Sequence, residues 1–140
     1  MDKLIVEKIT PTAKLPTRAH STDAGLDLYS DEDKVLAPGI RAFVKTGIKM
    51  AIPAGCVGLV WDKSGLAQAG LSTIGGVIDA AYRGELIIGI INLGQESYEI
   101  KAGQKIAQLL IQKIELPEIV ESELDKTDRG DKGFGSTGLN

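Results

Sequence analysis

The sequence predicts an all-β fold, a barrel or a jelly-roll-like body made of many short strands. Short runs of alternating apolar and polar residues recur along the chain, with turn residues at close spacing between them. Glycine supplies 17 of the 140 residues, which suits many turns better than long helices. Because neither an internal repeat nor an interdomain linker is apparent, we expect one β-rich domain, residues 1–128, and a glycine-rich C-terminal arm, residues 129–140.

The amino-acid composition limits the classes of function that we expect for this chain. With 43% hydrophobic residues, 25% charged residues and a net charge of -3, the chain has the balance of one ordinary soluble domain. The mild negative charge gives no reason to expect a nucleic-acid partner. The N-terminal residues carry charges where a signal peptide needs an apolar core, and no apolar run approaches membrane length. We therefore expect a cytoplasmic protein with no membrane partner.

A strand is expected at residues 4–9, where apolar and charged residues alternate, and it is a candidate for pairing at a subunit boundary. A connection rich in chain breakers follows at residues 11–16. His20 is the single histidine and Cys56 the single cysteine, which excludes an intrachain disulfide and gives no zinc-ligand set. We expect His20 in a surface loop and Cys56 buried where a turn meets a strand.

The segment STDAGLDLYS, residues 21–30, carries two carboxylates, Asp23 and Asp27, around a glycine. In a strand, Asp27 and Tyr29 share one face and the neighbouring leucines share the other. Two such carboxylates can serve a hard cation through water. A solvated strand end is the plainer interpretation, and it is favoured for this segment taken alone.

The clearest alternation in the chain runs over residues 40–52 and predicts one long antiparallel strand with one wet face. A Pro-Ala-Gly turn at residues 53–55 and a second strand at residues 57–61 follow. This second strand leads into DKSGLA, residues 62–67, where Lys63 offers charge, Ser64 a donor and Gly65 close backbone approach. These three residues suit a phosphate-binding loop, but the segment is not a Walker loop and is a weak signal by itself.

The segment GGVIDAAYRGELIIGIINLG, residues 75–94, predicts a β-hairpin around which the candidate chemistry gathers. Its turn holds Asp79, Tyr82 and Arg83, a carboxylate, an aromatic ring and a cation within a few residues. Backbone groups at a hairpin mouth can be aimed at a ligand edge without moving. A plain hairpin with Asp79 as an ordinary turn residue is the alternative, and it is favoured on these residues alone.

Residues 102–114 fit a helical stripe as well as a strand, and the glycine before them, the proline after them and the β-rich context favour a strand. Gln108 and Gln112 then share a face. The chain turns acidic after Pro117 and ends in RGDKGFGSTGLN. A frayed tail is the common fate of such a terminus. Its arginine could nevertheless bind a phosphate bidentately, its phenylalanine offers a ring for stacking, and its two hydroxyls can donate hydrogen bonds.

Taken together and in this order, five stretches resemble the trimeric dUTP nucleotidohydrolase (dUTPase) family: DAGLDLYS, DKSGLA, GGVIDAAYRGE, GQKIAQL and RGDKGFGSTG. The resemblance implies a distorted jelly-roll-like β-barrel with a flexible glycine-rich arm, assembled as a homotrimer whose active sites combine parts of all three subunits. It also implies Mg2+-dependent hydrolysis of dUTP to dUMP and pyrophosphate by water attack on the α-phosphate. That activity limits uracil incorporation into DNA and supplies dUMP for dTMP synthesis.

The resemblance also implies a role for each matching residue. Asp79 would activate the attacking water, Tyr82 would pack under the deoxyribose, and Asp27 would hold Mg2+ through water. The remaining contacts would come from the hairpin backbone and its facing strand for uracil (Gly76, Val77, Ile78, Asp79, Ile87), from Phe134 for stacking on the base, and from a phosphate-binding set (Lys63, Ser64, Gly65, Gln108, Arg129, Gly135, Ser136).

The chain departs from the family at the phosphate loop, where Asp62-Lys63 replaces the usual Pro-Arg, so that the bidentate fork of arginine is lost. The span between Ala67 and Val77 is about one residue short, and an asparagine often found near Thr73 is absent. The related dCTP deaminases share the fold but carry a catalytic glutamate at the position of Gly89, which makes deamination the weaker alternative. A non-catalytic trimeric nucleotide-binding or protein-binding module is the other alternative.

Overall fold

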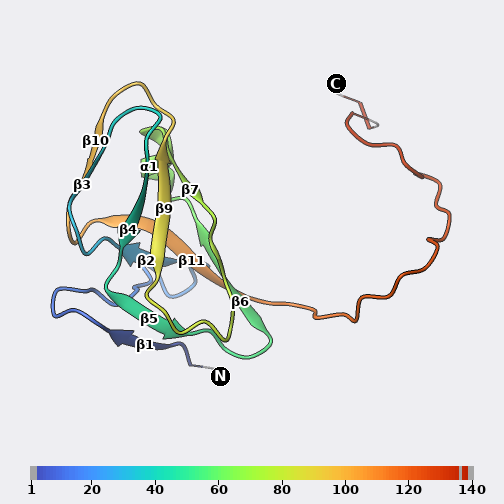
Figure 1. The fold of residues 1–140 in the computed structure, drawn as a ribbon, viewed down its shortest axis with the longest axis horizontal. Coiled ribbons are helices and arrows are strands. Elements are labelled where there is room, and N and C mark those ends of the chain that lie inside the picture. The colour runs from blue at the N-terminus through green and yellow to red at the C-terminus, as the bar shows by residue number, and fades with distance from the viewer. Residues whose placement is uncertain (1–2, 136, 139–140) are drawn as a thin grey trace.

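The computed structural model describes residues 3–135 and 137–138, and its regular structure is almost entirely β. Figure 1 shows the strands gathered into one body, from which the C-terminal segment departs. The elements are β1 (Ile5–Lys8), β2 (Leu26–Tyr29), β3 (Lys34–Leu36), β4 (Arg41–Lys45), β5 (Ile48–Ala51), β6 (Cys56–Trp61), α1 (Ser64–Gln68), β7 (Leu71–Ile74), β8 (Val77–Ile78), β9 (Ile87–Asn92), β10 (Tyr98–Ile100) and β11 (Lys105–Lys113).

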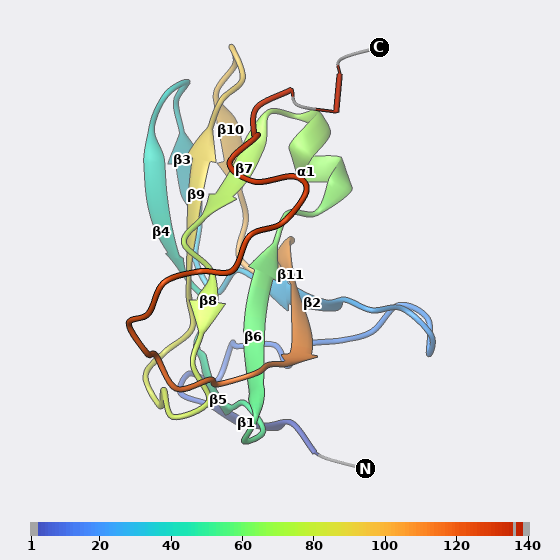
Figure 2. The same cartoon turned by 90° about the vertical axis from the view of Figure 1, so that its right-hand side faces the viewer.

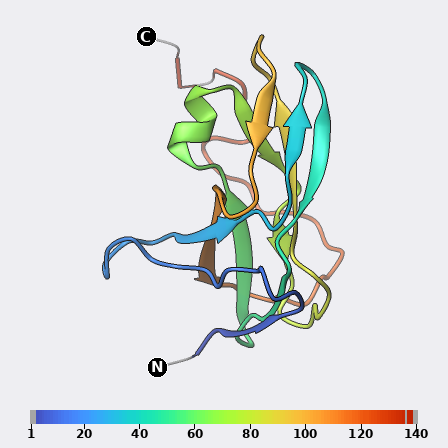
Figure 3. The ribbon, with the colours of Figure 1, turned by 90° about the vertical axis from the view of Figure 1, so that its left-hand side faces the viewer.

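The strands pair antiparallel throughout and form sheets of order β2-β11-β6-β8, β4-β9-β7, β1-β5 and β3-β10. The all-β prediction is therefore confirmed, although the hydrogen-bonded strands of the described residues group into these sheets rather than into one closed barrel. Figures 2 and 3 show that α1 lies at one end of the body and that the long loop between β1 and β2 projects from its side.

An aliphatic core joins the sheets. Branched side chains fill it because the sequence is only 4% aromatic, and the burial of such side chains provides the main driving force for folding. Cys56 is buried at the start of β6, as expected, and His20 is exposed in the loop between β1 and β2. The largest fully buried apolar side chains are Leu28, Leu36, Val44, Ile48, Leu86, Ile88, Ile90, Ile100, Ile106 and Leu109.

Two strand predictions hold well. The strand expected at residues 4–9 is β1, and the ambiguous stretch at residues 102–114 is β11, whose pairing with β2 shifts register between Lys105 and Ala107. The single strand expected over residues 40–52 is wrong, because the chain breaks between β4 and β5 at Gly47, which has φ +68°. The alternation carried no sign of this break, since the buried positions Val44, Ile48 and Met50 keep period 2 across it.

The predicted β-hairpin is also wrong in its pairing. β8 does not pair with β9: it pairs with β6, whereas β9 pairs with β4 on one side and β7 on the other. The two arms of the expected hairpin thus belong to different sheets and spread apart around the turn at residues 79–86. Sequence reasoning did not identify β3, β7, β10 or α1.

Gly47 and its neighbour Thr46 hold this turn in place through hydrogen bonds. The Gly47 N–H donates to Glu85 Oε2 at 3.0 Å, and the Thr46 hydroxyl donates to Leu86 O at 2.5 Å. A Cβ at position 47 would lie 2.6 Å from both Asp31 Oδ2 and Thr10 Oγ1, so only glycine satisfies both the backbone conformation and the space.

The C-terminal segment leaves the body after β11 and curves away from it (Figure 1). From residue 114 to residue 135 it has no helix or strand, and nearly all of it is exposed. Within the described part of the chain, no helix is long and apolar enough to cross a membrane.

Gly47→Ala should destabilise the fold by roughly 2–4 kcal/mol, since it adds left-handed strain to an overpacked site. Gly55→Ala is the matched control: Gly55 has φ +77°, but nothing lies within 4 Å of its added Cβ. The control should cost about 1–2 kcal/mol from backbone strain alone. Urea unfolding measures both values, and equal losses would show that the packing around Gly47 contributes nothing.

Candidate active site

The predicted site residues fall into three groups in the structure. A loop cluster joins Asp27, Lys63, Ser64, Gly65 and Gln108; a turn pocket holds Val77, Ile78, Asp79, Tyr82 and Ile87; and the arm carries Arg129, Phe134 and Gly135. The predicted phosphate contact Ser136 lies outside the described residues.

Strand register brings the loop cluster together. On β11, Gln108 pairs with Asp27 of β2 on one side and with Trp61 of β6 on the other. Lys63 follows two residues after Trp61, so its ammonium reaches across to Asp27 Oδ1 at 2.5 Å. Lys105, at the start of β11, contacts Asp27 Oδ2 at 2.9 Å.

Asp27 therefore holds two cations. Its side chain is almost completely buried, which raises its pKa, but the hydrogen bonds and charges of Lys63 and Lys105 outweigh this effect and leave the pKa below its usual value. The same contact raises the pKa of Lys105, mainly through its hydrogen bond to Asp27. Two lysines around one aspartate leave one excess positive charge, which suits an anionic ligand. Sequence reasoning missed Lys105, although it stands within the GQKIAQL stretch.

Ser64 and Gly65 form the first turn of α1, and Lys63 is its N-cap. Gln108 supports this loop from β11, because its Nε2 donates to Asp62 O at 2.8 Å. The side chain of Gln108 lies against Gly25, where a Cβ would come 2.1 Å from Oε1. A glycine is needed at position 25 for this approach.

The turn pocket encloses about 160 Å³ and is lined by residues from β8, from the turn and from the start of β9, among them Glu85 and Leu86. Since β8 is the edge strand of its sheet, the N–H and C=O groups along its outer edge have no strand partner among the described residues. Gly76, with φ +107°, lets β8 approach β6: a Cβ there would lie 2.9 Å from Val60 O. The Gly76 carbonyl also accepts from Val60 N at 2.8 Å.

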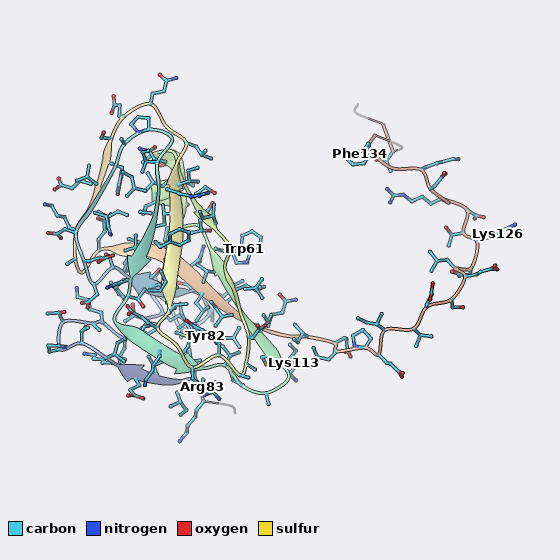
Figure 4. The ribbon with its side chains drawn as sticks, in the orientation of Figure 1. Trp61, Tyr82, Arg83, Lys113, Lys126 and Phe134 are labelled. Carbon is cyan, nitrogen blue, oxygen red and sulfur yellow. The ribbon has the colours of Figure 1, made fainter. Side chains whose placement is uncertain are left out.

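Asp79 opens the turn and Tyr82 lies over it. The Tyr82 N–H donates to Asp79 O at 3.1 Å, and the Tyr82 hydroxyl donates to Glu85 O at 2.9 Å. The ring covers Gly84, where a Cβ would lie 2.4 Å from the Tyr82 hydroxyl. Arg83 turns back on its own backbone and donates to Ala80 O at 2.6 Å. Figure 4 shows Tyr82 and Arg83 at the same end of the body.

The turn pocket and the loop cluster lie at opposite ends of β6. Ile78 pairs with Gly58, so Asp79 lies level with Val57, and Lys63 comes six residues later. At roughly 3.3 Å per residue, the two side chains of one chain start about 20 Å apart. The structure therefore does not bring the predicted base and the predicted phosphate-binding lysine together within a single chain.

The arm is separate from both groups. Phe134 is fully exposed, and Figure 4 shows it away from Trp61 and Tyr82. Among the described residues the arm's hydrogen bonds are local, such as Arg129 Nε to Lys132 O at 2.9 Å. Gly130 and Gly135 take positive φ values, as the many glycines of the arm allow.

The structure also bears on metal binding and on the alternative reaction. No three His, Cys, Asp or Glu residues in the described ranges, 3–135 and 137–138, gather closely enough to hold a metal ion.

Gly89 lies buried on β9, where a Cβ would come 2.8 Å from both Cγ1 and O of Ile74. There is no room for the glutamate that a dCTP deaminase carries at that position.

The chain is similar to known proteins over nearly its whole length. The dUTPase family model matches residues 11–138. The deoxyuridine 5'-triphosphate nucleotidohydrolase of Mycobacterium marinum is 51% identical over 147 residues, which cover 98% of this chain and 96% of the relative. The protein of the same name from Mycobacterium leprae is 50% identical and covers 96% and 94%.

Two solved phage structures extend the match to the fold. A mutant dUTPase of Staphylococcus bacteriophage 80alpha, solved with dUpNHpp, has a TM-score of 0.92 and 35% identity over 99% of this chain and all of that one. A mutant dUTPase of phage phi11 of S. aureus, described with a structural Mg(II) ion, has a TM-score of 0.83 and 33% identity over 88% and 98% of the two chains. With the family model and the close relatives covering nearly its whole length, the chain belongs to the dUTPase family.

Proposed function

We propose that this protein hydrolyses dUTP to dUMP and pyrophosphate, with Asp79 activating the water that attacks the α-phosphate. The observation that carries this assignment is the position of Asp79, on the wall of a pocket and at the end of β8, whose outer edge has no strand partner among the described residues. A carboxylate there can take a proton from a water aligned with the phosphorus. Phosphoryl transfer otherwise depends on positioning and on charge neutralisation, which the loop cluster supplies.

The turn pocket is the proposed nucleoside site. The free edge of β8, from Gly76 to Asp79, presents backbone donors and acceptors to the uracil edge, and Ile87 faces it from β9. Tyr82 is fixed by its hydrogen bond to Glu85 O, so its ring forms a rigid floor under the sugar. Such a floor favours a deoxyribose because it leaves no room for a 2′-hydroxyl.

The phosphates are assigned to the loop cluster and the arm. Lys63 carries charge, while Ser64, Gly65 and Gln108 add donors or close backbone approach. Arg129 would meet a terminal phosphate bidentately, with Gly135 and Ser136 beside it, and Phe134 would stack on the base.

A homotrimer is proposed because these groups are dispersed in one chain. Asp79 cannot act on a phosphate that Lys63 of the same chain binds, since catalytic contacts need about 3 Å and the two residues start about 20 Å apart. A cyclic assembly solves this problem by placing the turn pocket of one subunit against the loop cluster of a second and the arm of a third.

Mg2+ is the proposed cofactor, with Asp27 as an outer contact through water. Because Lys63 and Lys105 occupy both carboxylate oxygens of Asp27, the residues fit a water-mediated ion better than direct coordination. The ion would neutralise phosphate charge and orient the triphosphate. Asp27 would also hold Lys63 in place until substrate phosphates compete for it.

The proposal includes a cytoplasmic role. Removing dUTP limits uracil incorporation into DNA only where the precursors of DNA synthesis are held, and the dUMP formed there is available for dTMP synthesis.

Purified protein with Mg2+ should release pyrophosphate from dUTP and should act much more weakly on UTP and dTTP. The rate of pyrophosphate release from each of the three nucleotides measures this preference. Tyr82→Ala should reduce the preference for dUTP over UTP roughly tenfold or more, because the floor under the sugar is lost. Tyr82→Phe keeps the ring but loses the hydrogen bond to Glu85 O that fixes it, so it should keep more of the preference than Tyr82→Ala does. Comparable turnover of UTP and dUTP by the unaltered protein would refute the role of Tyr82.

Asp79→Asn should lower kcat by about 10²–10⁴ and leave dUTP affinity nearly unchanged, since the amide keeps the shape but takes no proton. Single-turnover kinetics and equilibrium binding separate the two quantities. Glu99→Gln is the control, because Glu99 is exposed and pairs only with Lys101 at the surface among the described residues. Near-normal turnover by Asp79→Asn would leave Asp79 as an ordinary turn residue.

Deleting residues 129–140 should abolish most of the activity without changing the melting temperature or the trimeric mass measured by light scattering. Phe134→Ala should cost less, about 1–3 kcal/mol of stacking. Full activity after the deletion would reduce the arm to a frayed terminus. A collapsed melt would make it structural, and a monomeric mass with full activity would refute the shared site.

A further inference from the structure

Asp62 makes more hydrogen bonds than its place in a loop requires. Its Oδ1 accepts from the Thr73 N–H at 2.7 Å and from the Thr73 hydroxyl at 2.6 Å, and its Oδ2 accepts from the Ser72 hydroxyl at 3.2 Å. Its backbone carbonyl accepts from Gln108 Nε2 at 2.8 Å. Every one of these partners lies on a strand, so the loop residue is tied to the rigid part of the fold.

These contacts join two separate sheets. Asp62 directly follows β6, which belongs to the sheet of order β2-β11-β6-β8, whereas Ser72 and Thr73 lie on β7 of the sheet β4-β9-β7. Trp61, labelled in Figure 4, marks the end of β6 where the bridge is made. Because Asp62 and Thr73 are both partly buried, losing the Asp62 acceptor would leave the N–H of Thr73 without its partner, at a fraction of the cost of a fully buried donor.

The contacts of Asp62 also restrain the backbone of Lys63. Lys63 follows Asp62 in the chain and has a long flexible stem, so the place where its ammonium can reach depends on where its backbone is fixed. Asp27 restrains only the tip of that stem, and a substrate phosphate would compete for the same ammonium. When that contact is exchanged for one with phosphate, the Asp62 bridge still holds the backbone of Lys63, Ser64 and Gly65.

A carboxylate beside a phosphate site repels the ligand unless its charge is engaged elsewhere. Three donors from Ser72 and Thr73 engage the Asp62 carboxylate and hold it against β7. An aspartate can therefore stand next to Lys63 and still support the binding of a phosphate.

We propose that Asp62 is a positioning residue, which clamps the loop of residues 62–65 to β7 and so sets where Lys63 meets the phosphates of the substrate. The inference rests on the proposed function of the loop cluster. It predicts that Asp62 acts through Lys63 and affects the binding of phosphates, not of the nucleoside.

The experiment is a double-mutant cycle of Asp62→Ala and Lys63→Ala, with dUpNHpp and deoxyuridine as probes of the triphosphate and of the nucleoside. Asp62→Ala should weaken dUpNHpp binding and raise KM for dUTP roughly tenfold, while deoxyuridine binding measured by NMR titration should change less than about twofold. In the Lys63→Ala background, Asp62→Ala should add less than about threefold. Asp62→Asn keeps Oδ1 as an acceptor for Thr73 and should restore most of the affinity.

Thr73→Val is the second variant, because it removes one donor to Asp62 and keeps the fold if Asp62→Ala fails a thermal melt. It should weaken dUpNHpp binding in the same direction by a smaller factor, again with little effect on deoxyuridine. Equal losses for dUpNHpp and deoxyuridine, or fully additive effects of Asp62→Ala and Lys63→Ala, would overturn the inference. Failure of the unaltered protein to hydrolyse dUTP would instead refute the proposed function.

Discussion

Strand β6 sets the constraint on which the rest of the structure depends. It pairs with β11 on one side and with β8 on the other, so it fixes the position of both halves of the candidate site. The pairing with β11 brings Lys63 to Asp27 and Gln108, and the pairing with β8 places Asp79 beside the turn pocket. Because a strand is stiff and extended, the two halves are held about 20 Å apart in each chain.

This rigidity explains why one small domain can be well folded and yet have an incomplete site. Each half is organised locally: Asp27 balances two lysines, and Tyr82 is fixed over its turn by Glu85 O. Neither half can reach the other without breaking the ladder of β6. The exposed segment after β11 likewise leads the arm away from its own body. Association of several subunits requires no rearrangement of these parts, which is why we favour it over a conformational change.

Much of the fold class followed from sequence because short apolar runs between turn residues are a local signal, and β1 and β11 lie where such runs predicted strands. The pairing of β8 did not, since a two-residue strand carries no information about its partner and its neighbours in sequence favoured a hairpin. The break at Gly47 was hidden because alternation continues across it. The motifs identified candidate residues such as Asp79 and Lys63, but only long-range register could reveal that they lie apart, that Lys105 shares Asp27 and that Asp62 bonds to β7.

The central claim is that Asp79 and Lys63 of different subunits act in one site, and subunit complementation tests it most directly. Asp79→Asn and Lys63→Ala chains are each nearly inactive under this account. Unfolding and refolding them together in equal amounts should restore about one quarter of the sites by random assortment in a trimer. The same chains mixed without refolding are the control. Activity in the refolded mixture near a quarter of normal supports the claim, and activity no higher than the sum of the separate variants contradicts it.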